Sequence, residues 1–156
     1  MHFSLLYVSE KPSTWAEQAC QFYIKRLPAE FGFRQSRISP VKRTKNSHID
    51  AIKQQEWQRI KDKASKQALI VLLDERGKQY SSQQFSQQIE KWQHHGRDIN
   101  FVIAGADGVT PDHRQQADAM ISLSPLTLPH EMARLFLIEQ LYRGWTILTN
   151  HPYHRV

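Results

Sequence analysis

The carboxyl-terminal end of the chain concentrates side chains that can move protons and hold negative charge. Tyr153, His154 and Arg155 are consecutive, and Arg143 lies ten residues before the first of them. A neutral imidazole can accept a proton, a guanidinium can hold a phosphate or a developing negative oxygen, and a phenol ring can stack on a nucleic-acid base. The segment is a candidate for acid–base chemistry, and a solvated, frayed end is the alternative.

Two histidines of the same tail, His151 and His154, raise the question of a metal site. Pro152 keeps the backbone between them extended, and no third ligand stands at a suitable spacing. The sequence therefore predicts no metal ion at this position.

Three further stretches follow predicted strands, where α/β proteins bind their ligands. They are residues 73–77, 104–108 and 124–129. The middle stretch, Ala104-Gly105-Ala106-Asp107-Gly108, matches neither GxGxxG nor GxxxxGK, which disfavours nicotinamide dinucleotides and nucleoside triphosphates. Because these loops carry almost no titratable side chains, we expect an apolar, backbone-lined pocket, which suits a neutral adenine better than a phosphate. Gly105 and Gly108 as simple turn glycines are the alternative.

Hydrophobic periodicity predicts the elements that position these stretches. Strands are predicted at residues 3–8, 31–40, 68–73, 99–104 and 119–123, with a turn at 74–78. Helices are predicted at 13–28, 48–65, 81–95 and 131–148, with a short one opening near 110. Trp15, Ala19, Phe22 and Leu27 would form the apolar face of the first helix, and Ser47 with Asp50 a capping box for the second. The alternation predicts one α/β domain over residues 1–156, with a mainly parallel sheet flanked by helices on both faces.

Composition excludes several classes of protein. The chain is 40% hydrophobic and 23% charged, and its longest apolar run, residues 68–73, is far shorter than the ~20 residues that cross a bilayer. The first residues read as a strand rather than a signal peptide, so a cytoplasmic protein without a membrane segment is expected. Cys20 is the single cysteine, and its apolar neighbours at helical spacing favour a buried small hydrophobe over a catalytic thiol.

The net charge of +6 and the pI of about 9.6 concern partners rather than fold. Charge alone does not distinguish a protein that binds RNA or DNA from one that is merely soluble. Lys42, Arg43 and Lys45 lie on a predicted loop without an apolar anchor, so we expect them to contact RNA phosphates. A merely solvated loop is the alternative.

Four long motifs resemble those of one known family. They are Phe101-Val102-Ile103-Ala104-Gly105-Ala106-Asp107-Gly108, Leu123-Ser124-Pro125-Leu126-Thr127-Leu128-Pro129-His130, Glu139-Gln140-Leu141-Tyr142-Arg143 and Asn150-His151-Pro152-Tyr153-His154-Arg155. In order and overall length they closely resemble the ribosomal RNA large subunit methyltransferase H family, and the resemblance covers essentially the whole chain. Ala104 and Ser9 stand where the family usually has glycine. Because Gly105 and Gly108 are kept, we expect a tolerated variant.

The resemblance implies an S-adenosylmethionine-dependent enzyme of the SPOUT class that methylates N3 of a pseudouridine in 23S ribosomal RNA. It also implies a homodimer and a trefoil knot near the carboxyl terminus, whereas periodicity alone predicts an unknotted sheet. Catalysis would fall to Arg143, Tyr153, His154 and Arg155. The cofactor would lie among Leu73, Ala104, Gly105, Gly108, Leu123, Ser124, Pro125, Leu126, Thr127 and Leu128.

The helix predicted at 131–148 carries more apolar side chains than one face can use, which favours a dimer interface. A helix buried deeply within one chain is the alternative. In the implied dimer, the tail of one subunit would reach the cofactor loops of the other. The competing function is a non-catalytic RNA- or ribosome-binding protein with the same basic surface, which binding of S-adenosylmethionine would distinguish.

Overall fold

The structure, a computed structural model, describes residues 1–154 as alternating strands and helices. The elements are β1 (Phe3–Val8), α1 (Thr14–Ile24), the short 3-10 helix η1 (Ala29–Phe31), β2 (Arg34–Ile38), α2 (Ile49–Lys63), β3 (Leu69–Gln79), α3 (Ser82–His95), β4 (Ile99–Ile103), α4 (Pro111–Gln116), β5 (Ala119–Ser122) and α5 (His130–Leu148). Over these residues, no helix is both long and apolar enough to cross a membrane.

The five strands form one parallel sheet with the order β2-β1-β4-β3-β5. Every residue of the central strand β4 is buried, as expected for a strand covered on both faces. Strand β2 carries exposed arginines and lies at one edge. Because all strands run in the same direction, the loops that follow them emerge on one side of the sheet, at the carboxyl ends of the strands. The predicted α/β class and the mainly parallel sheet are confirmed.

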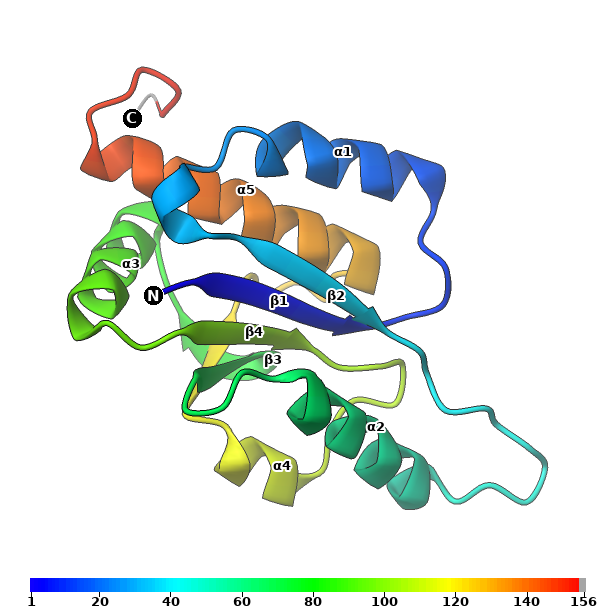
Figure 1. Ribbon diagram of the computed structural model, residues 1–156. Coiled ribbons are helices and arrows are strands. Elements are labelled where there is room, and N and C mark those ends of the chain that lie inside the picture. Colours follow the sequence, from blue (N-terminus) through cyan, green and yellow to red (C-terminus); the bar gives the residue numbers. More distant parts are fainter. Residues whose placement is uncertain (155–156) are drawn as a thin grey trace.

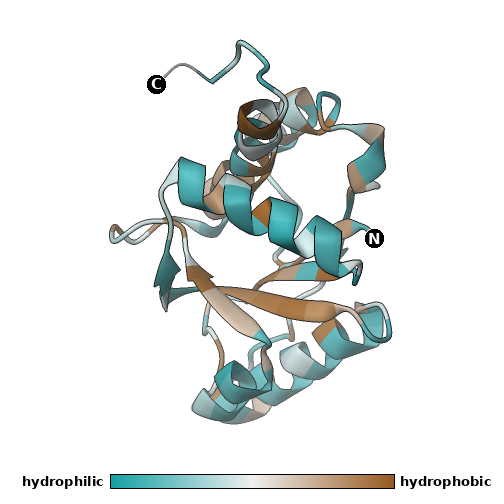
Figure 2. Cartoon of the chain, turned by 90° about the vertical axis from the view of Figure 1, so that its left-hand side faces the viewer, coloured by the Kyte–Doolittle hydropathy of each residue, from teal (hydrophilic) through white to brown (hydrophobic). Residues whose placement is uncertain are grey.

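The sheet lies between two layers of helices (Figure 1). Alternate residues of β1 face opposite sides, so Phe3 and Leu5 belong to one hydrophobic core and Leu6 and Val8 to another. The first core is covered by α1, α3 and α5, and the second by α2 and α4. Figure 2 shows hydrophobic strands between helices whose outer faces are largely hydrophilic.

Strand β3 continues through the residues predicted to form a turn at 74–78. Both Leu73 and Lys78 pair with Ile121 of β5, with an irregularity between them. A Cβ on Gly77 would lie only 2.5 Å from the backbone nitrogen of Ile121 and 2.6 Å from the carbonyl carbon of Met120. Only glycine permits this close approach of two backbones, so the predicted turn was wrong for a tertiary reason.

Two local predictions about the first helices are also wrong. Trp15 and Phe22 of α1 are each 49% exposed, and the helix instead turns Ala16 and Cys20 into the core. The predicted burial of Cys20 is confirmed. Helix α2 has no capping box, because Ser47 Oγ accepts a hydrogen bond from the Thr44 amide at 2.7 Å rather than one from the helix.

Helix α5 is mostly buried within its own chain. Leu137, Ile138 and Leu141 are fully buried against the sheet and the neighbouring helices. Buried Arg134 pairs with Glu17 of α1, and its guanidinium lies over the Tyr7 ring, with 4.4 Å to the ring centre. Burial within one chain therefore accounts for most of the apolar side chains that the sequence assigned to a dimer interface.

Candidate active site

A pocket of about 340 Å³ opens beside the irregular middle of β3 and the ends of β4 and β5. This volume is within the range of about 300–1,000 Å³ found for small-molecule sites. The three strand-end stretches chosen from the sequence all contribute to its wall, although they lie far apart in the chain. Of the residues assigned to the cofactor, the structure places these at the pocket: Leu73, Ala104, Gly105, Gly108, Leu123, Ser124, Leu126, Thr127 and Leu128. Pro125 is not among the lining residues.

The two glycines of the middle loop have different structural roles. A Cβ on Gly105 would lie 2.6 Å from Glu56 Oε1 and 3.2 Å from Val8 Cγ1, so a larger residue here would have to displace the Glu56 side chain. Gly108 has a φ of 78° and donates its amide to the Gly105 carbonyl at 2.9 Å, which closes the turn. The reading of both as simple turn glycines therefore holds only for Gly108.

Ala104 stands where the family resemblance led us to expect glycine. It is partly buried, and it packs against the core cluster on the α2 side of the sheet while also contributing to the pocket wall. Its methyl group thus has hydrophobic partners outside the pocket.

The third loop is held by its own side chains. Ser124 Oγ accepts the Leu126 amide at 2.9 Å, and Ser122 Oγ donates to the Ser124 carbonyl at 3.0 Å. These local bonds and two prolines fix the loop as a rigid wall. Leu126 is exposed at its tip.

The rim of the pocket carries more charge than the sequence suggested. Asp74 accepts a hydrogen bond from the Arg114 side chain at 3.1 Å and another from the Arg76 amide at 2.9 Å. Asp107 also lines the pocket and pairs with Arg43 at 2.5 Å. The expectation that these loops supply almost no titratable groups was wrong. Arg114 comes from α4, and sequence periodicity carries no signal that it lies beside Asp74.

His130, the first residue of α5, also lies at the pocket. Desolvation by neighbouring atoms lowers the pKa of His130 although part of the residue is exposed. The positive end of the helix dipole acts in the same direction. A neutral imidazole is therefore available at the pocket, at a residue we had quoted in a motif but not assigned to the site.

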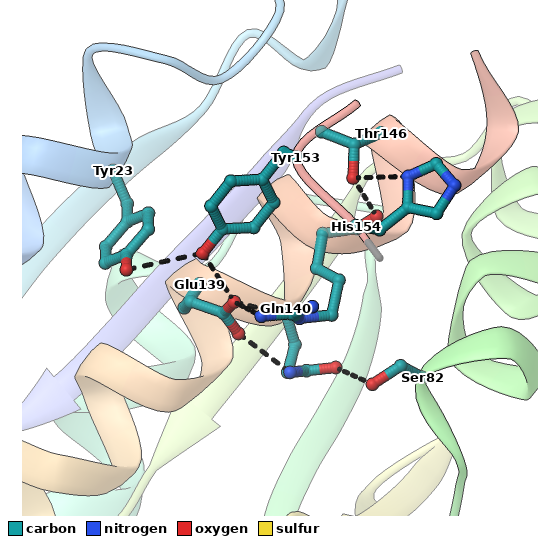
Figure 3. Close-up of polar contacts among 8 residues, drawn as sticks. Tyr23, Ser82, Glu139, Gln140, Thr146, Tyr153 and His154 are labelled. Atoms are coloured by element: carbon teal, nitrogen blue, oxygen red, sulfur yellow. Dashed lines mark hydrogen bonds and ion pairs between the residues drawn. The ribbon is translucent and has the colours of Figure 1, made fainter. Parts of the chain in front are cut away.

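The predicted catalytic tail folds back onto the end of α5 (Figure 3). Glu139 Oε1 accepts a hydrogen bond from the Tyr153 hydroxyl at 2.9 Å and pairs with Arg143 at 2.8 Å. The other carboxylate oxygen accepts from the Gln140 amide at 2.7 Å, and Gln140 in turn accepts from Ser82 Oγ at 2.7 Å. Sequence reasoning included Glu139 in a motif but missed its role in joining these groups.

The surroundings of Tyr153 keep its hydroxyl protonated. The Tyr153 ring packs against Tyr142 with 4.6 Å between ring centres, and the Arg143 guanidinium lies 5.0 Å from the ring centre. Burial, followed by hydrogen bonds to Tyr23 and Glu139, raises the pKa of Tyr153 well above its usual value. The phenol is therefore a hydrogen-bond donor at neutral pH.

The hydrogen bonds of His154 specify which of its nitrogens is free. The Thr146 hydroxyl donates its single proton to the Arg143 carbonyl at 2.7 Å. His154 Nδ1 lies 3.3 Å from the same hydroxyl oxygen, which can then only accept. A neutral His154 therefore carries its proton on Nδ1, and Nε2 remains free to accept one.

The tail follows the last residue of α5, at the opposite end of the helix from its first residue, His130 (Figure 1). Helix α5 has 19 residues, which corresponds to a length of roughly 28 Å. His130 at its start lines the pocket, whereas Tyr153 bonds to Glu139 at the middle of the helix and His154 packs on Thr146 near its other end. Within one chain the structure does not bring the predicted catalytic residues to the predicted cofactor loops. Arg155, the fourth catalytic candidate, lies outside the described residues.

Within residues 1–154, no group of three or more His, Cys, Asp or Glu side chains is arranged to hold a metal ion. In the tail, His151 Nδ1 accepts the Tyr153 amide at 3.1 Å.

Comparison with known proteins identifies the family. A family model described as a predicted SPOUT methyltransferase matches residues 1–154. A ribosomal RNA large subunit methyltransferase H from Paraburkholderia phymatum is 42% identical over 156 residues, covering 100% of both chains. A protein of the same name from Thioalkalivibrio sulfidiphilus is 40% identical over 155 residues, covering 99% of each. The chain belongs to the SPOUT methyltransferases, in the family of ribosomal RNA large subunit methyltransferase H.

Two solved structures share the fold of this SPOUT methyltransferase. A probable methylase family protein from Haemophilus influenzae Rd KW20 has a TM-score of 0.57 at 12% identity, covering 99% of this chain and 70% of the other. A putative RNA methyltransferase from Bacillus anthracis has a TM-score of 0.51 at 12% identity, covering 99% and 98%. At this identity the likeness concerns the fold alone, and the trefoil knot stays a prediction.

The pocket of this SPOUT methyltransferase fits the methyl donor expected for the family. Its loops present backbone groups and apolar side chains, and it has no phosphate-binding glycine motif. The carboxylates of Asp74 and Asp107 at the rim are already paired with Arg114 and Arg43, so the backbone groups and the apolar side chains carry the fit.

Proposed function

We propose that this protein transfers a methyl group from S-adenosylmethionine to N3 of a pseudouridine in 23S ribosomal RNA, in the cytoplasm. The observation that carries the proposal is one pocket shared by the middle of β3 and the loops after β4 and β5, in a chain of the methyltransferase H family. The pseudouridine and its N3 atom come from the family resemblance. Binding of the donor is supported by the backbone groups and the apolar side chains that line the pocket.

The reaction asks the protein mainly to align two molecules and to accept a proton. S-adenosylmethionine would supply an electrophilic methyl group on its sulfonium. For N3 to accept that methyl group, the protein would have to hold the base in line with the donor and take up the proton that leaves N3. His154 suits this role because its Nε2 is free, and Arg143 suits a developing negative charge on a neighbouring oxygen. His130, neutral at the pocket, is a second candidate base.

The separation between tail and pocket supports a homodimer with composite sites. In one chain, Glu139, which holds Tyr153, lies nine residues along α5 from His130, a distance of roughly 14 Å. A second copy that packs against α1 and α5 would bring the tail of one subunit to the pocket of the other. Three large apolar side chains on these helices remain exposed and available for such an interface: Trp15 and Phe22, at 49% each, and Phe136, at 38%.

The proposal is tested with ribosomal particles from a strain that lacks this protein. The purified protein is incubated with the particles and S-adenosylmethionine, and nucleosides of the 23S RNA are analysed by mass spectrometry. We expect one new N3-methylated pseudouridine. Free 23S RNA, isolated large subunits and assembled ribosomes, compared in parallel, identify the substrate.

Calorimetry separates this function from that of a non-catalytic RNA-binding protein. An enzyme should bind S-adenosylmethionine or its demethylated product. Absence of binding to both, together with unmodified ribosomal RNA, would contradict the proposal and favour simple RNA or ribosome binding.

A further inference from the structure

The positive charge of the chain is concentrated in one segment. Residues 34–63 contain nine Lys and Arg against three Asp and Glu, so their net charge of +6 equals that of the whole chain. The rest of the chain is neutral, with twelve residues of each sign. The segment comprises β2, the connection at residues 39–48 and α2. A protein whose excess charge lies on one structural unit presents a directed electrostatic surface.

The connection in this segment lies on the same side of the sheet as the pocket, at the carboxyl ends of the strands. Strand β2 pairs with β1, and β1 pairs with β4, whose following loop forms the pocket wall. Figure 1 shows the connection leaving the carboxyl end of β2 and projecting beyond the sheet before it enters α2. The ion pair between Arg43 and Asp107 joins this connection to the pocket loop.

Two arginines of the segment are held in place without losing their charge. Arg37 donates to the Ser9 carbonyl at 3.0 Å, and Arg59 donates to the Ser39 carbonyl at 2.6 Å. Neither forms an ion pair with another of the residues described. A carbonyl occupies one of the five donors of a guanidinium and leaves the others free.

Such arginines suit phosphate, because a guanidinium that is already oriented loses little conformational freedom on binding. Both side chains are exposed, as are Lys42 and Lys45 on the connection between them.

We propose that Arg37, Lys42, Lys45 and Arg59 form a strip that binds the phosphate backbone of the substrate RNA beside the methyl-donor pocket. The inference rests on the proposed function, and it identifies the RNA surface that this function needs. Arg43 has a different role in it, because Asp107 neutralises its charge and ties the strip to the pocket. The earlier grouping of Arg43 with Lys42 and Lys45 as equivalent phosphate contacts is therefore revised.

The test compares a double variant, Arg37→Gln with Arg59→Gln, with a matched control, Arg97→Gln. Arg97 is also exposed, and it also donates to a carbonyl, that of Gln67 at 2.9 Å. It precedes β4, however, and therefore lies at the opposite end of the strands from the pocket. Affinity for large ribosomal subunits is measured at several salt concentrations, and S-adenosylmethionine affinity by calorimetry. Thermal unfolding of each variant checks that it is folded.

We expect the double variant to bind subunits about tenfold more weakly, with a salt slope lower by roughly one to two, since each lost phosphate contact removes about 0.7–0.9 from it. S-adenosylmethionine affinity should stay within about twofold, and Arg97→Gln should resemble the wild type. Unchanged affinity and slope in the double variant, or an equal loss in Arg97→Gln, would overturn the inference. If the strip binds subunits as expected but wild-type protein leaves the RNA unmethylated, the strip stands and the proposed reaction fails.

Discussion

Glu139 controls the positions of the two tail-end groups that the proposed chemistry needs. One carboxylate oxygen of Glu139 accepts a hydrogen bond from the Tyr153 hydroxyl and forms an ion pair with Arg143. The other oxygen accepts a hydrogen bond from the side-chain amide of Gln140. The carboxylate therefore orients a phenol and a guanidinium together. It acts through these residues, so its role is one of positioning.

Replacing Glu139 should reduce turnover while leaving the donor pocket intact. We expect Glu139→Ala to lower kcat by about 10–100-fold, because Tyr153 and Arg143 lose their shared anchor. Glu139→Gln keeps an acceptor for Tyr153 and should restore part of that loss. Steady-state kinetics and calorimetry with S-adenosylmethionine distinguish the effects. Equal losses in donor affinity for both variants would indicate a general structural defect instead.

Gly77 tests the close approach of β3 and β5. Gly77→Ala would place a Cβ 2.5 Å from the Ile121 backbone, so we expect a loss of more than about 3 kcal/mol in the free energy of unfolding. Gly96→Ala is the control, because that glycine has a φ of 80° but no atom within 4 Å of the added Cβ. It should cost only about 1 kcal/mol. Urea denaturation measures both, and similar costs for the two would contradict the proposed crowding.

At the scale of elements, His113 joins α4 to α2 beneath the pocket loops. Its Nδ1 accepts the Thr110 amide at 3.2 Å, which places the ring proton on Nε2 for donation to Gln54 at 3.0 Å. The fully buried ring stacks on Trp57 with 4.8 Å between ring centres. Protonation of Nδ1 would remove the acceptor that caps α4.

This arrangement predicts a stability that falls in mild acid. Burial lowers the pKa of His113, with Lys53 and Lys61 acting in the same direction and Asp112 opposing them. The unfolded chain therefore binds more protons, and stability is lost as pH falls below about 7 and through the folded-state pKa. The urea midpoint should drop between pH 7 and pH 5, and less so in His113→Gln. The exposed His94→Gln serves as control, and a profile unchanged by His113→Gln would refute the assignment.

The tail is an element whose removal should separate binding from turnover. Deleting residues 151–156 removes the Tyr153–Glu139 contact but leaves α5 and every pocket residue in place. We expect folding, dimerisation and S-adenosylmethionine binding near normal, with methyl transfer at least about 100-fold slower. His154→Ala alone should have a milder effect if the ring imide loses its proton readily. A deleted protein that methylates ribosomes at the normal rate would leave the tail as an ordinary chain end.

At the scale of the whole molecule, the composite site predicts complementation between two inactive variants. Tail-deleted chains keep a pocket but lack a tail, whereas Gly105→Leu chains keep a tail but have a Cβ that clashes with Glu56. In mixed dimers, one of the two sites combines an intact pocket with an intact tail. Random reassortment should therefore restore roughly a quarter of wild-type activity.

The controls for this mixture test whether each variant is inactive by itself and whether both form dimers. Each variant alone should be inactive, and light scattering should give twice the monomer mass for both. Substituting Trp15 and Phe22 with Gln should weaken the dimer and abolish complementation if these exposed side chains form the interface. Full activity from a protein that remains monomeric at micromolar concentration would exclude the composite site.

Much of this fold and site could be predicted from the sequence, because those parts depend on residues that are close together in the chain. The apolar run of β4 and the helix predicted at 81–95 are local features, and each lies near its predicted position. The predicted strand ends likewise located all three stretches that line the pocket, with Pro125 outside its lining.

Tertiary structure decided which of these segments meet and which faces remain exposed. Sheet order and register determine several features that the sequence did not predict. They are the extension of β3, the ion pairs Asp74–Arg114 and Arg43–Asp107, and the exposure of Trp15. Helical spacing places Trp15 and Phe22 on one face of α1, but it does not say whether that face or the one with Cys20 meets the sheet. The length of α5 likewise separates tail from pocket, although both belong to one predicted site. Such contacts depend on the packing of elements that are distant in the chain, and periodicity within each element carries no information about them.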